Sequence, residues 1–371
     1  MMAAAAVVGA LAGGGGAARA AMTRAGVPGL AAGDITTVAG GFGGPGQGRD
    51  IALASVCGVG AGAGRVVLAD QDDDTAKDPV RALNPRTGWM NNLPATVTGA
   101  VSTCSPAVDH AGNVVLADPL DSRVKVVAKR TGTFYGRPMT KGQLYPVAGT
   151  GVAGFSGDCG PATAARLDRP YAVAVDRAGN LLIDDQFNER IRVVAERDGW
   201  FYGQQMTAGN IYTVAGNGKF GHYGEGILAT RARLSEPFGV AADPAGNLVI
   251  AGFIGRIRVV AVRAGVFYGQ AMRAGHIYTV AGGGTSGLGD GGPATDAELS
   301  IPQGVAADAA SNLLIADTGD NRVRVVAAST GTFYGQAMTA GDIYPVAGGG
   351  TGSLGDGGPA TSAEINGPGG V

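Results

Sequence analysis

The sequence predicts an all-β fold, a β-propeller of repeated four-stranded units, and three observations carry this prediction. Of 371 residues, 67 are glycine, although each glycine costs about 1 kcal/mol relative to alanine inside a helix. Hydrophobic residues make up 45% of the chain, which is too many for a disordered segment. The third observation is a repeat: Phe-Tyr-Gly begins at Phe134, Phe201, Phe267 and Phe333, which by subtraction are 67, 66 and 66 residues apart. Short strands joined by tight turns fit both the composition and the period.

One repeat unit, residues 239–282, contains four expected strands. Gly239–Asp243 is strand a, and the turn Pro-Ala-Gly-Asn leads to strand b, the apolar run from Leu248. Arg256–Val262 is strand c, and His276–Gly282 is strand d. A projecting hairpin with the Phe-Tyr-Gly motif lies between strands c and d. Such units bury both faces by stacking radially, which gives a propeller. A linear β-solenoid is the alternative, but its repeats are usually shorter.

The repeat also predicts the number of blades. Five copies of strands b and c occur between a spare strand d, Asp34–Gly40, and the beginning of a spare strand a at Pro368. We therefore expect five four-stranded blades and the start of a sixth, in a six-bladed ring that is truncated at the C-terminus. A closed five-bladed ring is the alternative. Residues 1–33 are expected to be an Ala/Gly-rich leader, either a signal peptide or a linker, and residues 34–371 the propeller.

The segment Gly289–Val326, GDGGPATDAELSIPQGVAADAASNLLIADTGDNRVRVV, resembles an NHL repeat. The resemblance covers about residues 34–371 and extends to NHL proteins of high-GC bacteria and to the propeller of teneurins. It implies a six-bladed propeller, most often a binding platform. A few relatives are enzymes, namely the peptidylglycine amidating lyase and the gluconolactonase-like hydrolases, so the fold alone does not assign a function. The pattern is broken in the first unit after Asp70 and in the fourth unit, where Gly252 replaces the aspartate.

The hairpins provide the predicted binding surface. The eight aromatic residues at matching places are Phe134, Tyr135, Phe201, Tyr202, Phe267, Tyr268, Phe333 and Tyr334. Large rigid rings contribute strongly to recognition, so the sequence predicts a non-catalytic scaffold that binds protein or carbohydrate. Packing of each hairpin on its neighbour is the alternative use of these rings. No cofactor is predicted.

Charged residues in the turns are expected to be structural. Asp118, Asp185 and Asp317 each precede an arginine by five residues, and we expect them to pair with Arg123, Arg190 and Arg322 across the b–c turn. Asp158, Asp290 and Asp356, with Glu225 at the matching place, precede a short Pro-Ala-Thr turn and are expected to cap it. Leu167, Leu234, Leu299 and Ile365 are the expected apolar anchors of these loops.

Two alternative functions remain: a lactonase or amidating lyase with a metal in the central channel, and a structural spacer in a larger surface protein. The three histidines, His110, His222 and His276, occupy different places in the repeat and do not predict one metal site. The aspartates of the a–b turns, Asp109, Asp176, Asp243 and Asp308, are the other candidate ligands at one end of the channel.

The net charge and the distribution of apolar residues also bear on binding partners and location. A formal net charge of −2 gives no field for nucleic acid, and no stretch is apolar enough to span a membrane. The leader predicts an extracellular or cell-surface location, within a longer multidomain protein. Cys57 and Cys104 occupy matching positions of neighbouring units, which allows one disulfide, and buried thiols are the alternative.

Overall fold

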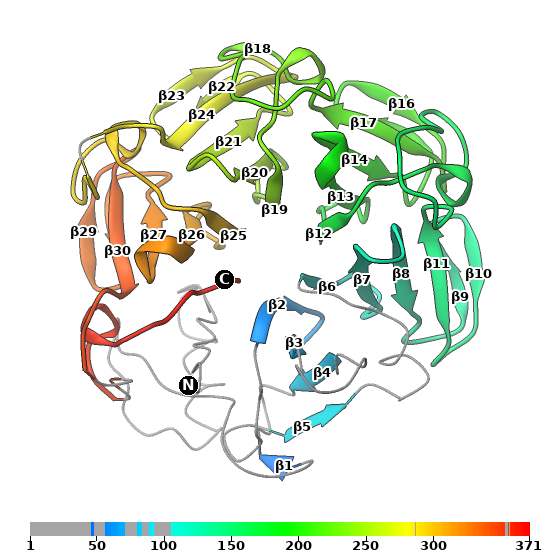
Figure 1. Cartoon of the computed structure of the whole chain (residues 1–371), viewed down its shortest axis with the longest axis horizontal. Helices are drawn as coiled ribbons and strands as arrows, with labels where there is room; N and C mark the ends of the chain where they lie inside the picture. Colours follow the sequence, from blue (N-terminus) through cyan, green and yellow to red (C-terminus); the bar gives the residue numbers. More distant parts are fainter. Residues whose placement is uncertain are drawn as a thin grey trace.

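Five antiparallel sheets stand around a common axis, and each sheet is one blade of a β-propeller (Figure 1). The computed structural model describes residues 46–47, 56–70, 80–83, 89–92, 105–285, 287–352, 355 and 357–371. These residues form strands and short 3-10 turns but no α-helix, so the predicted all-β propeller is confirmed. The leader and the spare strand Asp34–Gly40 lie outside the described residues.

The blades follow the chain order. Blade 1 contains β1 (Gly46–Gln47), β2 (Val56–Gly62), β3 (Arg65–Asp70), β4 (Val80–Leu83) and β5 (Trp89–Asn92). Blade 2 contains β6 (Pro106–Val108), β7 (Val114–Asp118), β8 (Arg123–Val127) and β11 (Leu144–Ala148). Blade 3 contains β12 (Pro170–Val175), β13 (Leu181–Asp185), β14 (Arg190–Val194) and β17 (Ile211–Ala215). Blade 4 contains β19 (Pro237–Ala242), β20 (Leu248–Gly252), β21 (Arg256–Val260) and β24 (His276–Gly282), with β18 (Ile227–Leu228) at its outer edge. Blade 5 contains β25 (Pro302–Ala307), β26 (Leu313–Asp317), β27 (Arg322–Val326) and β30 (Ile343–Gly348).

The predicted hairpins between strands c and d are separate two-stranded sheets at the rim of blades 2 to 5 (Figure 1). They are β9 (Gly132–Phe134) with β10 (Arg137–Met139), β15 (Gly199–Phe201) with β16 (Gln204–Met206), β22 (Gly265–Phe267) with β23 (Gln270–Met272), and β28 (Gly331–Phe333) with β29 (Gln336–Met338). The 3-10 turns are η2 (Ala162–Ala164), η4 (Ala229–Arg231), η5 (Ala294–Asp296) and η7 (Ala360–Ser362) in the linking loops, and η3 (Gln186–Asn188) and η6 (Thr318–Asp320) in b–c turns.

Most of the apolar core lies between neighbouring blades. One apolar cluster joins Val115 and Val124 of blade 2 to Leu181 and Ile183 of blade 3. Equivalent clusters join blade 3 to blade 4 and blade 4 to blade 5. Each sheet therefore covers its neighbour, as the repeat predicts. The loop anchors Leu167, Leu234, Leu299 and Ile365 are all buried in these clusters or in the cluster of blade 5, as expected.

The C-terminal residues occupy the space between blade 5 and blade 1 near the axis (Figure 1). Thr318 donates its hydroxyl to the carbonyl oxygen of Pro368 at 2.7 Å, on the blade 5 side. A Cβ atom added to Gly369 would lie 2.6 Å from the carbonyl oxygen of Cys57, on the blade 1 side. The tail thus lies next to both innermost strands, β25 and β2. Five blades are confirmed, whereas the predicted six-bladed ring and the NHL type are not shown.

Candidate active site beside the propeller axis

The tyrosines of the Phe-Tyr-Gly motifs turn back onto their own blades. The Tyr268 hydroxyl donates to Oδ2 of Asp243 at 2.8 Å, and Tyr135, Tyr202 and Tyr334 make the same bond to their a–b turn aspartates at 3.3, 3.0 and 2.8 Å. Each tyrosine has a positive φ near 50°, as the first residue of a tight hairpin turn whose second residue is glycine. Burial and the neighbouring carboxylate raise the pKa of Tyr135 and Tyr202 well above the ordinary value, so each hydroxyl stays a donor.

These contacts remove most of the predicted binding surface. Phe134, Tyr135 and Tyr268 are buried, and the other five rings are half-buried. The a–b turn aspartates are also taken up: Asp243 accepts the backbone N–H and the side-chain amide of Asn247, both at 2.8 Å. Asp109, Asp176 and Asp308 bind Asn113, Asn180 and Asn312 in the same way. They therefore hold the turn and the hairpin together, instead of offering oxygens to a metal at the channel.

The aspartates of the b–c turns form ion pairs other than the predicted ones. Asp185 lies 3.6 Å from Arg192, Asp317 lies 3.4 Å from Arg324, and Asp118 lies 2.7 Å from Lys125, so the partner is seven residues on. Of the predicted partners, Arg123 pairs with Asp121, Arg322 lies 3.7 Å from Asp290, and Arg190 lies over the ring of Phe155. The cation two positions further along strand c is the buried one, and a buried charge requires a partner.

The predicted caps of the linking-loop turns also have another role. Asp158 and Asp290 make no cap bond to η2 and η5; they hold the buried Arg192 at 2.7 Å and Arg324 at 2.5 Å. Asp356 lies outside the described residues. These carboxylates therefore neutralise the arginines of strand c.

Blade 3 carries a buried carboxyl that the other blades lack. Asp184 in β13 is fully buried, and neither of its oxygens has a hydrogen-bond partner. Burial, with the nearby carboxyls of Asp185 and Glu189, raises the pKa of Asp184 well above the ordinary value. The matching residues are Ala117, Ala251 and Ala316. Asp184 was not predicted as a site residue, although the change from Leu-Ile-Ala-Asp to Leu-Ile-Asp-Asp was the available signal.

Glu189 lies at the end of the same b–c turn, in a left-handed conformation with φ of 52°. Its Oε2 accepts the backbone N–H of Glu236, which enters blade 4, at 2.7 Å. Burial is the main cause that raises the pKa of Glu189 to about 7, and the charge of Glu236 adds to it. In blade 5 the amide oxygen of Asn321 accepts the N–H of Gly367 in the same arrangement, at 2.8 Å. A carboxyl is therefore not required for the contact itself.

A cluster of three aromatic rings includes Tyr171, which lies near Asp184. Tyr171 and Phe238, at the start of the innermost strands β12 and β19, meet edge to face with centroids 5.4 Å apart, and Phe253 meets Phe238 at 5.9 Å. Asp184 contributes to a raised pKa of Tyr171, behind the effect of burial. Phe253 is 41% exposed. We call Tyr171, Asp184, Glu189, Phe238 and Phe253 the axial site. It combines titratable groups whose pKa values are raised with three aromatic rings in contact, and clusters of perturbed titratable groups are candidates for functional sites.

Histidine and carboxylate side chains do not gather into a ligand set in the part of the chain that the structure describes. No three His, Cys, Asp or Glu residues there are placed to hold one metal ion. The residues of the axial site do not fit the metal of the predicted lactonase or lyase alternative, because only two of them carry a carboxyl group and none is a histidine.

Comparisons with known proteins give the fold alone. No protein-family model matches the chain, and no curated protein matches its sequence. The chain is similar to a gluconolactonase from Xanthomonas campestris, with 15% identity and a TM-score of 0.43 over 75% of this chain and 73% of that one. It is similar to a virginiamycin B lyase from Staphylococcus aureus, with 11% identity and a TM-score of 0.43 over 78% and 69%. A streptogramin B lyase shows 12% identity and a TM-score of 0.40 over 80% and 83%.

The prediction of a non-catalytic scaffold for protein or carbohydrate requires correction. The rings that were to form its binding surface are buried or half-buried, and four of them are tied to aspartates inside the blade.

Proposed function

We propose that this chain is a propeller enzyme that performs acid–base catalysis at the axial site. The observation that carries the proposal is the fully buried, unpartnered carboxyl of Asp184 near Glu189, whose pKa is raised to about 7. An unpartnered buried carboxyl costs stability, and such costs are tolerated where a site needs them. Alanine stands at this place in other blades, so the fold does not require a carboxyl there. This supports a functional role for Asp184.

Each carboxyl has a role that follows from its protonation. A group with a pKa of about 7 is present in both forms at neutral pH, which suits Glu189 to take up and return a proton. Asp184 is kept protonated by burial and has an O–H to donate to a substrate oxygen. Tyr171, Phe238 and Phe253 would pack against the substrate and exclude water.

The substrate class we put first is a cyclic ester with an apolar face. Such a ring would pack on Phe238 and Phe253, and ring opening requires proton transfers that two carboxyls can supply. In this reaction, Glu189 takes a proton from the water that attacks the ester carbon. The carbonyl oxygen accepts a hydrogen bond from Asp184, and the departing ring oxygen receives the proton from Glu189.

A lactone panel assayed by acid release tests the proposal. The wild-type chain should hydrolyse at least one member, and Glu189→Gln should lose at least 100-fold in kcat/KM while it keeps the wild-type melting temperature within a few degrees. The amide oxygen of glutamine can still accept the N–H of Glu236, as Asn321 does for Gly367. Asn321→Asp is the matched control and should keep full activity. No turnover across the panel, or full activity in Glu189→Gln, would reject the proposal.

An extracellular or cell-surface location remains part of the proposal. Cys57 is disulfide-bonded, which supports an oxidising compartment; its predicted partner, Cys104, lies outside the described residues. In the part of the chain that the structure describes, no helix has the length and apolarity needed to cross a membrane. We keep the prediction that no nucleic acid is bound.

A further inference from the structure

Blade 4 lacks a carboxylate that each of blades 2, 3 and 5 uses to neutralise a buried cation. In those blades, Asp118, Asp185 and Asp317 end strand b, and Lys125, Arg192 and Arg324 lie within 2.7, 3.6 and 3.4 Å of them. The corresponding residues of blade 4 are Gly252 and Arg258. Arg258 is only 4% exposed, so the change leaves a buried cation without that partner.

The second carboxylate is also weaker in blade 4. Asp158 accepts from both Nε and Nη2 of Arg192, at 3.1 and 2.7 Å, and Asp290 does the same for Arg324 at 3.0 and 2.5 Å. Glu225 stands at this place in blade 4, and its oxygens instead accept from the N–H and hydroxyl of Thr279 at 2.7 and 2.8 Å. Its distance to Nη2 of Arg258 is 3.9 Å, and the buried Nε of Arg258 has no partner.

The charges around the buried arginine therefore do not balance in blade 4. In blade 3, Arg190 and Arg192 face Asp158 and Asp185, and blade 5 has the same two-to-two composition. In blade 4 the matching residues are Arg256 and Arg258 with Glu225 alone, which gives one positive charge more than negative charges. Isolation of a buried charge is costly, so one negative charge from outside the chain would restore the balance.

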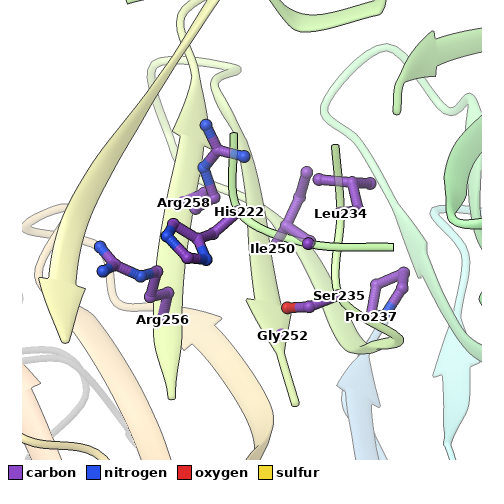
Figure 2. Close-up of a pocket in the computed structure, with 9 residues that line it drawn as sticks. His222, Leu234, Ser235, Pro237, Ile250, Gly252, Arg256 and Arg258 are labelled. Atoms are coloured by element: carbon purple, nitrogen blue, oxygen red, sulfur yellow. The ribbon is translucent and has the colours of Figure 1, made fainter. Parts of the chain in front are cut away.

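A cavity lies where the missing carboxylate would be. Figure 2 shows it between Arg256 and Arg258 of β21, Ile250 and Gly252 of β20, and the loop of His222 and Ser235. Its volume of about 10 Å³ is room for roughly one water molecule or one small ion. A Cβ atom added to Gly252 would lie 2.8 Å from the hydroxyl oxygen of Ser235.

The donors for an anion are present at this cavity. In blade 5, the backbone N–H of Ser300 donates to Oδ1 of Asp317 at 2.8 Å, and in blade 3 the N–H of Asp168 donates to Asp185 at 2.7 Å. The matching N–H in blade 4 belongs to Ser235, and Gly252 has no carboxylate to accept it. An anion in the place of Asp185 or Asp317 would receive this N–H and the Ser235 hydroxyl. It would also face Nη1 of Arg258, which already donates to the carbonyl oxygen of Arg233 at 2.9 Å.

We propose that blade 4 binds one small monovalent anion, a halide or a formate-sized carboxylate, between Gly252, Ser235 and Arg258. The anion takes the place of the aspartate that ends strand b in the neighbouring blades. The site adjoins the axial site, because Gly252 precedes Phe253 and the N–H of Phe253 donates to the carbonyl oxygen of Ser235 at 2.8 Å. The proposal does not depend on the proposed enzyme activity.

The test compares melting temperatures of the full chain in sodium chloride, sodium formate and sodium gluconate at one ionic strength, because gluconate is too large for the cavity. Wild type should melt about 2 to 5 °C higher in chloride or formate than in gluconate, with saturation as the small anion is titrated. The salt that acts, chloride or formate, identifies whether the ligand is a halide or a carboxylate. Equal melting temperatures in all three salts would overturn the proposal, since a water molecule alone would then fill the cavity.

Two variants locate the effect. Gly252→Asp introduces the carboxylate of the other blades beside Ser235, as Asp317 lies beside Ser300. The melting temperature of this variant should no longer depend on the anion. In gluconate it should be at least as high as that of wild type in chloride. Asp317→Gly creates the same gap in blade 5 and should enlarge the dependence. If Gly252→Asp folds and the dependence persists unchanged, the anion binds elsewhere and the proposal is wrong. If Gly252→Asp does not fold, an unchanged dependence in Asp317→Gly rejects it.

Discussion

The hydroxyl of Tyr268 donates to Oδ2 of Asp243 at 2.8 Å, and this bond ties the rim hairpin of blade 4 to the a–b turn of the same blade. The same aspartate accepts both nitrogens of Asn247, whose Oδ1 in turn accepts the N–H of Val262 at 3.0 Å. The a–b turn, the end of strand c and the rim hairpin are thereby joined. The Phe-Tyr-Gly motif recurs because it closes this network in each of blades 2 to 5.

Tyr268→Phe should lower the free energy of unfolding by about 1 to 3 kcal/mol, because it removes one hydrogen bond to a buried carboxylate. Urea unfolding followed by fluorescence measures the change. Tyr223→Phe is the control, since Tyr223 is 68% exposed, and it should stay within about 0.5 kcal/mol of wild type. An equal loss in both variants would contradict the assigned role of the bond.

Asp184→Ala should raise the free energy of unfolding at pH 7 by about 1 to 3 kcal/mol, because it removes a buried carboxyl with no hydrogen-bond partner. The same variant should lose lactonase activity under the proposed function. Ala251→Asp is the matched reverse change in blade 4 and should be destabilising. A destabilised Asp184→Ala would mean that Asp184 has a structural partner.

Stability should fall as pH rises between about 4.5 and 7, through the titration of Glu189. Its folded pKa of about 7 lies above the ordinary value of 4.5, so the folded state binds more protons within this window. The contribution is fully present below pH 4.5 and is lost above pH 7. Asp185 and Asp317, each raised to about 6 from 3.8 by burial, act in the same direction at lower pH. Urea unfolding at pH 5.5 and 8.0 measures the slope, and Glu189→Gln should flatten it; an unchanged slope would contradict the assignment.

Thiol counting should find one reactive cysteine in the unfolded chain before reduction and three after it. Cys159 is free and exposed, whereas Cys57 is disulfide-bonded. Maleimide labelling in denaturant with mass spectrometry makes the count, and Cys159→Ser should leave none before reduction. Three labelled thiols without reduction would argue against the disulfide and against the proposed oxidising compartment.

The repeat pattern predicts the all-β propeller, because the strands and turns of a blade are specified by local patterns that recur. Apolar strands b, the turn glycines and the spacing of Phe-Tyr-Gly predict the blade, its strand order and the buried loop anchors such as Leu167. The sequence did not predict the ion-pair partners of the charged residues. Asp185 precedes both Arg190 and Arg192, and only the packing of strand c against the linking loop decides that Arg192 is the buried one.

Which residues form a site depends on their surroundings in the folded chain. The Phe-Tyr-Gly motif does not show whether the ring of Tyr268 faces solvent or its own blade. In the fold, the ring faces its own blade. Conversely, Asp184 and Gly252 are single departures from the repeat, and their consequences depend on what surrounds them. An unpaired carboxyl or arginine costs free energy only when it is buried, because its removal from water is then not compensated by a partner.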